Sequence, residues 1–108
     1  MHLAMKGSKI MNINLNVVGN ILTVSLDGRL DTTTAPQLDN TVRTSLNGIS
    51  KLIFDMEKLT YISSAGLRIL LSAQKIMSAR DGMKIKNCCA EVLEIFDITG
   101  FTDILDIE

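Results

Sequence analysis

The sequence has few of the residues that build disulfide, metal or catalytic sites. It has no tryptophan, one proline and one histidine, and only 4% of its residues are aromatic. Its two cysteines, Cys88 and Cys89, are neighbours, which makes them poor disulfide partners, and a metal site would need further Cys or His ligands. We therefore expect no disulfide, no metal and no cofactor, and a reducing, cytoplasmic environment.

The charges show no excess of either sign. The chain has 11 basic and 12 acidic residues, which are scattered along it and give a net charge of -1. A nucleic-acid ligand is not expected, because no basic patch is visible. Apolar runs such as Ile69–Leu71 are far shorter than the roughly 20 residues that cross a bilayer, so no direct membrane insertion is expected. A chain of 108 residues fits one domain.

The N-terminal residues 1–11 do not match the periodic pattern that follows. They lack the long apolar segment of a secretory signal. We predict that residues 1–11 are a leader or an ambiguous start and that one domain spans residues 12–108.

Strand signals occur in four places. Residues 12–18 and 22–26 alternate between apolar and polar side chains on either side of Gly19-Asn20, which predicts a β-hairpin. The compact apolar run at 51–56 predicts a buried strand, and residues 83–87 predict a short one.

Helical spacing of apolar residues separates these strands. It predicts helices that start near Pro36 and close near Gly48, that run over 64–80, and that run over 90–97. The tail at 101–107 fits either a last strand or a helical turn. The order β-β-α-β-α-β-α predicts an α/β fold, a mixed β-sheet packed with α-helices.

Two hydroxyl residues, Ser63 and Ser64, stand where the second helix begins. The first N–H groups of a helix have no partner within it, and the helix dipole places partial positive charge there. A phosphate on Ser64 would be stabilised at this position. The alternative is that one of these serines only caps the helix, as serine does routinely.

Three motifs resemble the STAS domains of bacterial anti-sigma-factor antagonists. They are LTYISSAGLRILL at Leu59–Leu71, GRLDTTTAP at Gly28–Pro36 and EIFDITGF at Glu94–Phe101. Aligned on Gly66-Leu67, the resemblance implies that Ser64 is the phosphoacceptor, with Ser63 a minor alternative. The sequence has Ser63 where the family often has aspartate, and Ala65 where it often has serine or threonine.

The resemblance implies a partner switch rather than an enzyme. The unmodified protein would bind an anti-sigma factor that is a serine kinase, phosphorylation of Ser64 would end that binding, and a serine phosphatase would restore it. Candidate partner-binding residues are Asp31, Ser63, Gly66, Leu67 and Leu71. We expect Leu67 and Leu71 to be partly exposed, because they lie away from the core-facing stripe of their helix. Asp31 could instead be a helix-cap aspartate.

Other functions remain open or lack support. A STAS domain can also be an accessory subunit of a membrane transport or stress-signalling complex. A phospho-aspartate receiver domain would use Asp55 at a strand end, but the acidic cluster and the lysine that it needs are missing. A serine hydrolase is not expected, because there is no G-x-S-x-G motif and the single histidine is His2.

Overall fold

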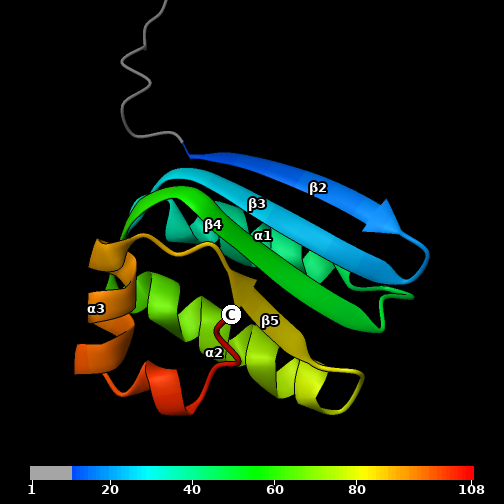
Figure 1. The fold of residues 1–108 in the computed structure, drawn as a ribbon. Coiled ribbons are helices and arrows are strands. Elements are labelled where there is room, and N and C mark those ends of the chain that lie inside the picture. The colour runs from blue at the N-terminus through cyan, green and yellow to red at the C-terminus, as the bar shows by residue number, and fades with distance from the viewer. Residues whose placement is uncertain (1–10) are drawn as a thin grey trace, which may run out of the picture.

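The computed structural model describes residues 11–108, in which a mixed β-sheet carries helices against it (Figure 1). In chain order the elements are β2 (Asn12–Val18), β3 (Ile21–Leu30), α1 (Ala35–Ser45), β4 (Lys51–Ile62), α2 (Ser64–Ser78), β5 (Met83–Lys86), α3 (Ala90–Ile98) and the 3-10 helix η1 (Phe101–Asp103). The predicted α/β class and the order β-β-α-β-α-β-α are confirmed.

The strands of the described sheet lie in the order β2-β3-β4-β5. β2 and β3 pair antiparallel through the turn at Gly19-Asn20, as the alternation predicted, and β3, β4 and β5 are parallel. The helices α1 and α2 connect the parallel strands and contact each other, so both lie on one face of the sheet. The start of α2 therefore comes directly after the long central strand β4.

The core lies between this face and the helices. Alternate residues of β3 and β4 point into it, since successive side chains of a strand point to opposite faces. The fully buried members of this set are Leu22, Val24, Leu26, Leu30, Leu52, Phe54, Met56 and Ile62. The residues between them, such as Thr23 and Ser25, are only partly buried, which explains the alternation seen in the sequence.

β4 extends well beyond the apolar run that predicted it. The prediction ended at Met56 because two charged residues, Glu57 and Lys58, interrupt the pattern. The strand continues to Ile62 because it stays paired with β3, with shifts of register near Gly28. Gly28 has a φ of 124°, a conformation that favours glycine. The extension brings the ends of β3 and β4 together beside the start of α2.

Of the two alternatives predicted for the C-terminal tail, the structure has the helical turn and only a single bridge in place of a strand. Phe101–Asp103 form one 3-10 turn, and Ile107 then makes an isolated parallel bridge to Ile85 of β5. Lys84 of β5 contacts the carboxylates of Asp106 and Glu108 at 3.3 Å each. The free edge of β5 is therefore covered by the tail.

The described part of the chain begins with a core residue. Met11, which was assigned to the leader, is fully buried, and its carbonyl accepts a hydrogen bond of 2.7 Å from Gln37 Nε2. The rest of the predicted leader, residues 1–10, lies outside the described residues. Among residues 11–108, no helix has the length and apolar character required to cross a membrane.

Candidate functional site at the start of α2

The start of α2 is held by the end of β3. The backbone N–H of Ser63 donates to the carbonyl of Leu30 at 2.8 Å. Ser63 is the N-cap residue with extended backbone, and its carbonyl accepts the first bond of the helix from Leu67 N–H at 2.9 Å. The last residues of both central strands thus position the two serines.

The two serines differ in what their hydroxyls can reach. Ser63 Oγ is buried, has no hydrogen-bond partner among the described residues, and does not cap the helix. Ser64 is the first residue of α2 and is exposed. A modifying enzyme can therefore approach the hydroxyl of Ser64, whereas that of Ser63 is inaccessible in this conformation.

The backbone of the first turn is open to an incoming acceptor. The first helical bond is donated by Leu67, which leaves the N–H groups of Ser64, Ala65 and Gly66 without an acceptor in the described part of the chain. These groups carry the partial positive charge of the helix dipole. An anionic group attached at Ser64 would lie beside them.

Gly66 allows α2 to approach β3 closely. A Cβ at this position would lie 2.6 Å from Leu30 Cγ and 2.9 Å from Ile62 Cγ1, which is too close for carbon atoms that are not bonded to each other. Gly66 is itself buried, so the structure shows a packing role for it rather than an exposed contact. The absence of a side chain at Gly66 allows the first turn of α2 to pack directly against Leu30 and Ile62.

The prediction that Leu67 is partly exposed is wrong. Its side chain is 6% exposed and belongs to the hydrophobic core, because the close approach at Gly66 draws the first turn of α2 inward. Leu71, one turn later, is partly buried and reaches the surface. Ile76, near the end of the same helix, is 42% exposed. The buried stripe of α2 runs along most of the helix and consists of Gly66, Leu67, Ile69, Leu70, Ala73 and Met77.

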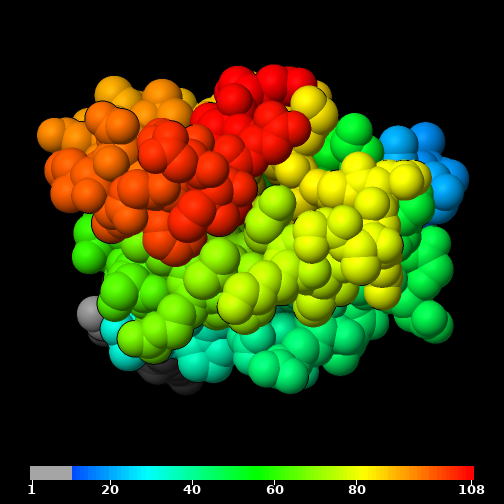
Figure 2. Space-filling view, turned by 90° about the horizontal axis from the view of Figure 1, so that it is seen from below, coloured from blue at the N-terminus to red at the C-terminus, as the bar shows by residue number. Residues whose placement is uncertain are grey.

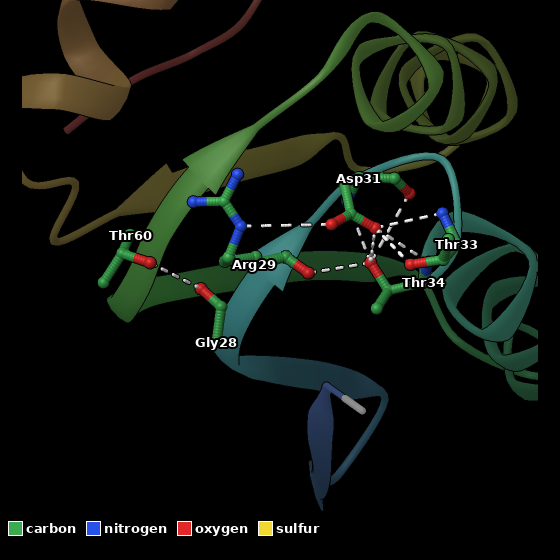
Figure 3. Close-up of polar contacts among 6 residues, drawn as sticks. All are labelled: Gly28, Arg29, Asp31, Thr33, Thr34 and Thr60. Atoms are coloured by element: carbon green, nitrogen blue, oxygen red, sulfur yellow. Dashed lines mark hydrogen bonds and ion pairs between the residues drawn. The ribbon is translucent and has the colours of Figure 1, made fainter. Parts of the chain in front are cut away.

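Asp31 lies in the loop between β3 and α1, one residue after the carbonyl that holds Ser63 (Figure 3). Asp31 Oδ1 accepts hydrogen bonds from Thr33 Oγ1 at 2.7 Å, Thr33 N at 3.0 Å and Thr34 N at 3.1 Å. These bonds, the Thr33 hydroxyl first, lower the pKa of Asp31. Asp31 therefore holds its own loop together rather than capping α1, whose N-cap residue is Thr34, and it also lies next to the start of α2.

Thr34 and Arg29 fix the shape of this loop. The buried Thr34 Oγ1 donates to the Arg29 carbonyl at 2.7 Å and accepts from Asp31 N–H at 2.9 Å (Figure 3). The Arg29 guanidinium lies 4.3 Å from the centre of the Tyr61 ring, and its Nε is 3.9 Å from Asp31 Oδ2. Arg29, Asp31, Thr34 and Tyr61 thus form a connected group beside the start of α2, which we call the rim.

A shallow groove runs between α1 and α2 from this rim. Figure 2 shows α2 crossing the face that carries it, between α1 and the C-terminal segment. The residues that line the part nearest Ser64 are Ala35, Pro36, Asp39, Ala65, Arg68, Ile69 and Ser72. Sequence reasoning missed Asp39 and Arg68. The spacing of four residues between Ser64 and Arg68, which places them on one side of a helix, could have identified the latter.

Residues 11–108 do not form the acidic metal site that a receiver domain needs. Asp55 lies in the middle of β4 and not at its end, and its Oδ1 accepts from Asn87 Nδ2 and from Glu57 N–H at 3.1 Å each. Within residues 11–108, no group of three or more His, Cys, Asp or Glu residues could hold a metal ion. The structure therefore does not support the receiver alternative.

The chain is similar to known proteins over nearly all of its described length. The family model described as "STAS domain" matches residues 12–108. The "Anti-sigma-B factor antagonist" of Bacillus subtilis is 30% identical over 100 residues, which cover 90% of this chain and 92% of that protein.

Two solved structures share the fold. An anti-sigma factor antagonist from Mycobacterium paratuberculosis has a TM-score of 0.83 at 18% identity, covering 92% of this chain and 86% of that one. The Bacillus cell fate determinant SpoIIAA in the phosphorylated form has a TM-score of 0.69 at 19% identity, covering 90% of this chain and 91% of that one. Together with the family match over nearly all of its described length, these findings show that the chain belongs to the STAS domain family.

Proposed function

We propose that this protein is a cytoplasmic anti-sigma-factor antagonist that binds an anti-sigma factor serine kinase until it is phosphorylated on Ser64. It is a binding regulator and not an enzyme, and a serine phosphatase restores its binding form. The observation that carries the proposal is the exposed Ser64 hydroxyl at a helix start whose N–H groups are free, next to a groove. The name of the Bacillus subtilis relative and the phosphorylated SpoIIAA structure support it.

The physical basis of the switch is electrostatic. A phosphate ester adds about -1.5 to -2 charges and three acceptor oxygens. The free N–H groups of the first turn and Arg68, one turn away on the same helix, would stabilise it on this chain. A partner seated on the groove and on Ser64 would then have to bury a dianion, which costs desolvation and repels any acidic surface. The backbone of this chain does not have to move.

Phosphorylation can be tested with the two neighbouring serines as a matched pair. The anti-sigma factor kinase from the same cell is incubated with ATP and the wild-type, Ser63→Ala and Ser64→Ala proteins, and the modified residue is located by peptide mapping. We expect one phosphate on the wild-type and Ser63→Ala proteins and none on Ser64→Ala. Full modification of Ser64→Ala would contradict the proposal.

Partner release can be tested separately with Ser64→Asp. This variant should bind the same kinase at least tenfold more weakly, while its free energy of unfolding stays within about 1 kcal/mol of wild type. Ser78→Asp, also exposed on α2 but at the far end of the helix and outside the groove, is the control for added charge. Equal affinity for wild type and Ser64→Asp would show that Ser64 only begins a helix. Capture of a transport protein in place of a kinase would favour the accessory-subunit alternative.

A further inference from the structure

The two edges of the described sheet differ in whether another segment pairs with them. At one edge the short strand β5 carries Lys84 and Lys86, and the C-terminal tail pairs with it through Ile85. At the other edge the longer strand β2 lies at the margin of the sheet, and no described strand pairs with its outer side (Figure 1). Proteins usually protect such an edge with charge, proline or a bulge. Residues 12–18 contain none of these.

The register of the hairpin shows which backbone groups face outward. Val18 and Ile21 flank a two-residue turn, so they form a hydrogen-bonded pair within the hairpin. Hydrogen-bonded and outward-facing residues then alternate along an antiparallel strand. The N–H and C=O groups of Ile13, Leu15 and Val17 therefore point away from β3. We call these three residues the β2 edge.

The side chains of the β2 edge lie on the helix-bearing face of the sheet. Leu15 is paired with Val24 and Val17 with Leu22, and residues paired across two strands share a face. Leu22 and Val24 are buried, but β2 lies farther out, where Leu15 is 47% and Val17 is 56% exposed. The edge thus combines outward backbone donors and acceptors with adjacent apolar side chains.

The geometry points to a second copy of this chain as the occupant of the β2 edge. Two β2 strands related by a two-fold axis through Leu15 would pair antiparallel, with Leu15 opposite Leu15 and Ile13 opposite Val17 of the other copy. All outward N–H and C=O groups would find reciprocal partners, and the apolar side chains would meet on one face. The surface is complementary to itself, as a two-fold interface requires.

The absence of charge on β2 favours pairing between two copies of this strand. No residue from Asn12 to Val18 is charged, so two copies meet without repulsion. On the other face of the strands, Asn14 would lie opposite Asn16, again without charge. A contact formed by one strand from each copy is small, so the dimer should be reversible and concentration-dependent. The contact does not involve Ser64, so the dimer can be tested independently of the proposed switch.

The first test measures the mass of the full chain in solution. Light scattering after gel filtration over micromolar to millimolar concentrations should show a shift from 11.8 kDa toward twice that mass. Leu15→Lys should remain monomeric throughout, because two charges would meet at the two-fold axis. Ile98→Lys, at a side chain of α3 that is 77% exposed, should dimerise like wild type. A wild-type chain that stays monomeric at all concentrations would overturn the inference, as would a dimeric Leu15→Lys.

The second test does not depend on how Leu15→Lys folds. Leu15→Cys places two thiols at facing positions, where strand spacing allows a disulfide, and mild oxidation should give a covalent dimer. Ile98→Cys is the matched exposed control, and wild type reports any reaction of Cys88 and Cys89, which are partly buried. Burial also raises the pKa of Cys88 to about 11, which keeps that thiol protonated. If Leu15→Cys cross-links no more than Ile98→Cys, β2 edges do not pair.

Discussion

The starts of α1 and α2 are built from similar residues but differ in whether their side chains are hydrogen-bonded. Each helix follows the end of a central strand, and each is preceded by hydroxyl side chains. Before α1, Thr34 is buried and bonded on both sides, and the Asp31 carboxylate accepts three hydrogen bonds. Before α2, Ser63 Oγ has no partner among residues 11–108, and Ser64 is exposed. We call the start of α1 closed, because its side chains are hydrogen-bonded to one another and to the backbone, and the start of α2 open, because its hydroxyls are not.

This difference shows that hydroxyl residues before a helix do not by themselves reveal their role. A closed start contributes to stability, so changing it should affect unfolding. An open start contributes little to stability, so changing it should affect what binds there. The substitutions below separate the two, from the largest expected change in the free energy of unfolding to the smallest.

The largest effect is expected at Gly66, which lets the open start lie against β3. Gly66→Val should lower the free energy of unfolding by about 3 kcal/mol, because its side chain would overlap Leu30 and Ile62. Chemical denaturation measures this loss. Ser72→Val, on the exposed side of the same helix, should change stability by less than about 1 kcal/mol. Similar values for the two variants would show that the close contact is not restrictive.

The closed start should lose stability when its buried hydroxyl is removed. Thr34→Val keeps the shape of the side chain but leaves the Arg29 carbonyl and the Asp31 N–H without their partner, at a cost of about 1–2 kcal/mol. Thermal and denaturant unfolding both report this change. Thr32→Val is the control in the same loop, because Thr32 is exposed. A loss no greater than that of Thr32→Val would contradict the assigned role of Thr34.

Asp31 should give the closed start a dependence on pH. Its pKa is lowered in the folded protein, so its contribution to stability is complete above the unfolded pKa and disappears as the pH falls through the folded value. This window lies below about pH 4. Stability measured over acidic pH should therefore fall less steeply for Asp31→Asn than for wild type. Parallel curves would mean that the carboxylate is not stabilised by Thr33 and Thr34.

The smallest effect on stability is expected at the open start. An N-cap serine normally contributes about 1 kcal/mol, but Ser63 Oγ makes no capping bond. Ser63→Ala should therefore leave the free energy of unfolding unchanged or raise it slightly, since it removes a buried hydroxyl without a partner. Ser64→Ala should be equally neutral. A loss of about 1 kcal/mol in Ser63→Ala would show that the hydroxyl caps the helix in solution.

Much of the fold could be predicted because local patterns agreed with the final packing. The bounds of β2 and the hairpin turn followed from strict alternation on either side of Gly19-Asn20. The second half of β4 could not be predicted, because Glu57 and Lys58 break the apolar pattern and only pairing with β3 keeps the strand extended. The burial of Leu67 was missed for a similar reason, since it depends on contacts made across the sheet at Gly66.

The sequence by itself determined the order of strands and helices, the family resemblance and the position of two serines at a helix start, because these depend on residue spacing along one chain. Only the tertiary structure decided which serine faces solvent, which leucine is buried, and that Asp31 is bonded within its own loop. Those outcomes depend on how closely separate elements approach one another. The spacing of apolar residues within one helix or strand does not show how closely that element packs against another.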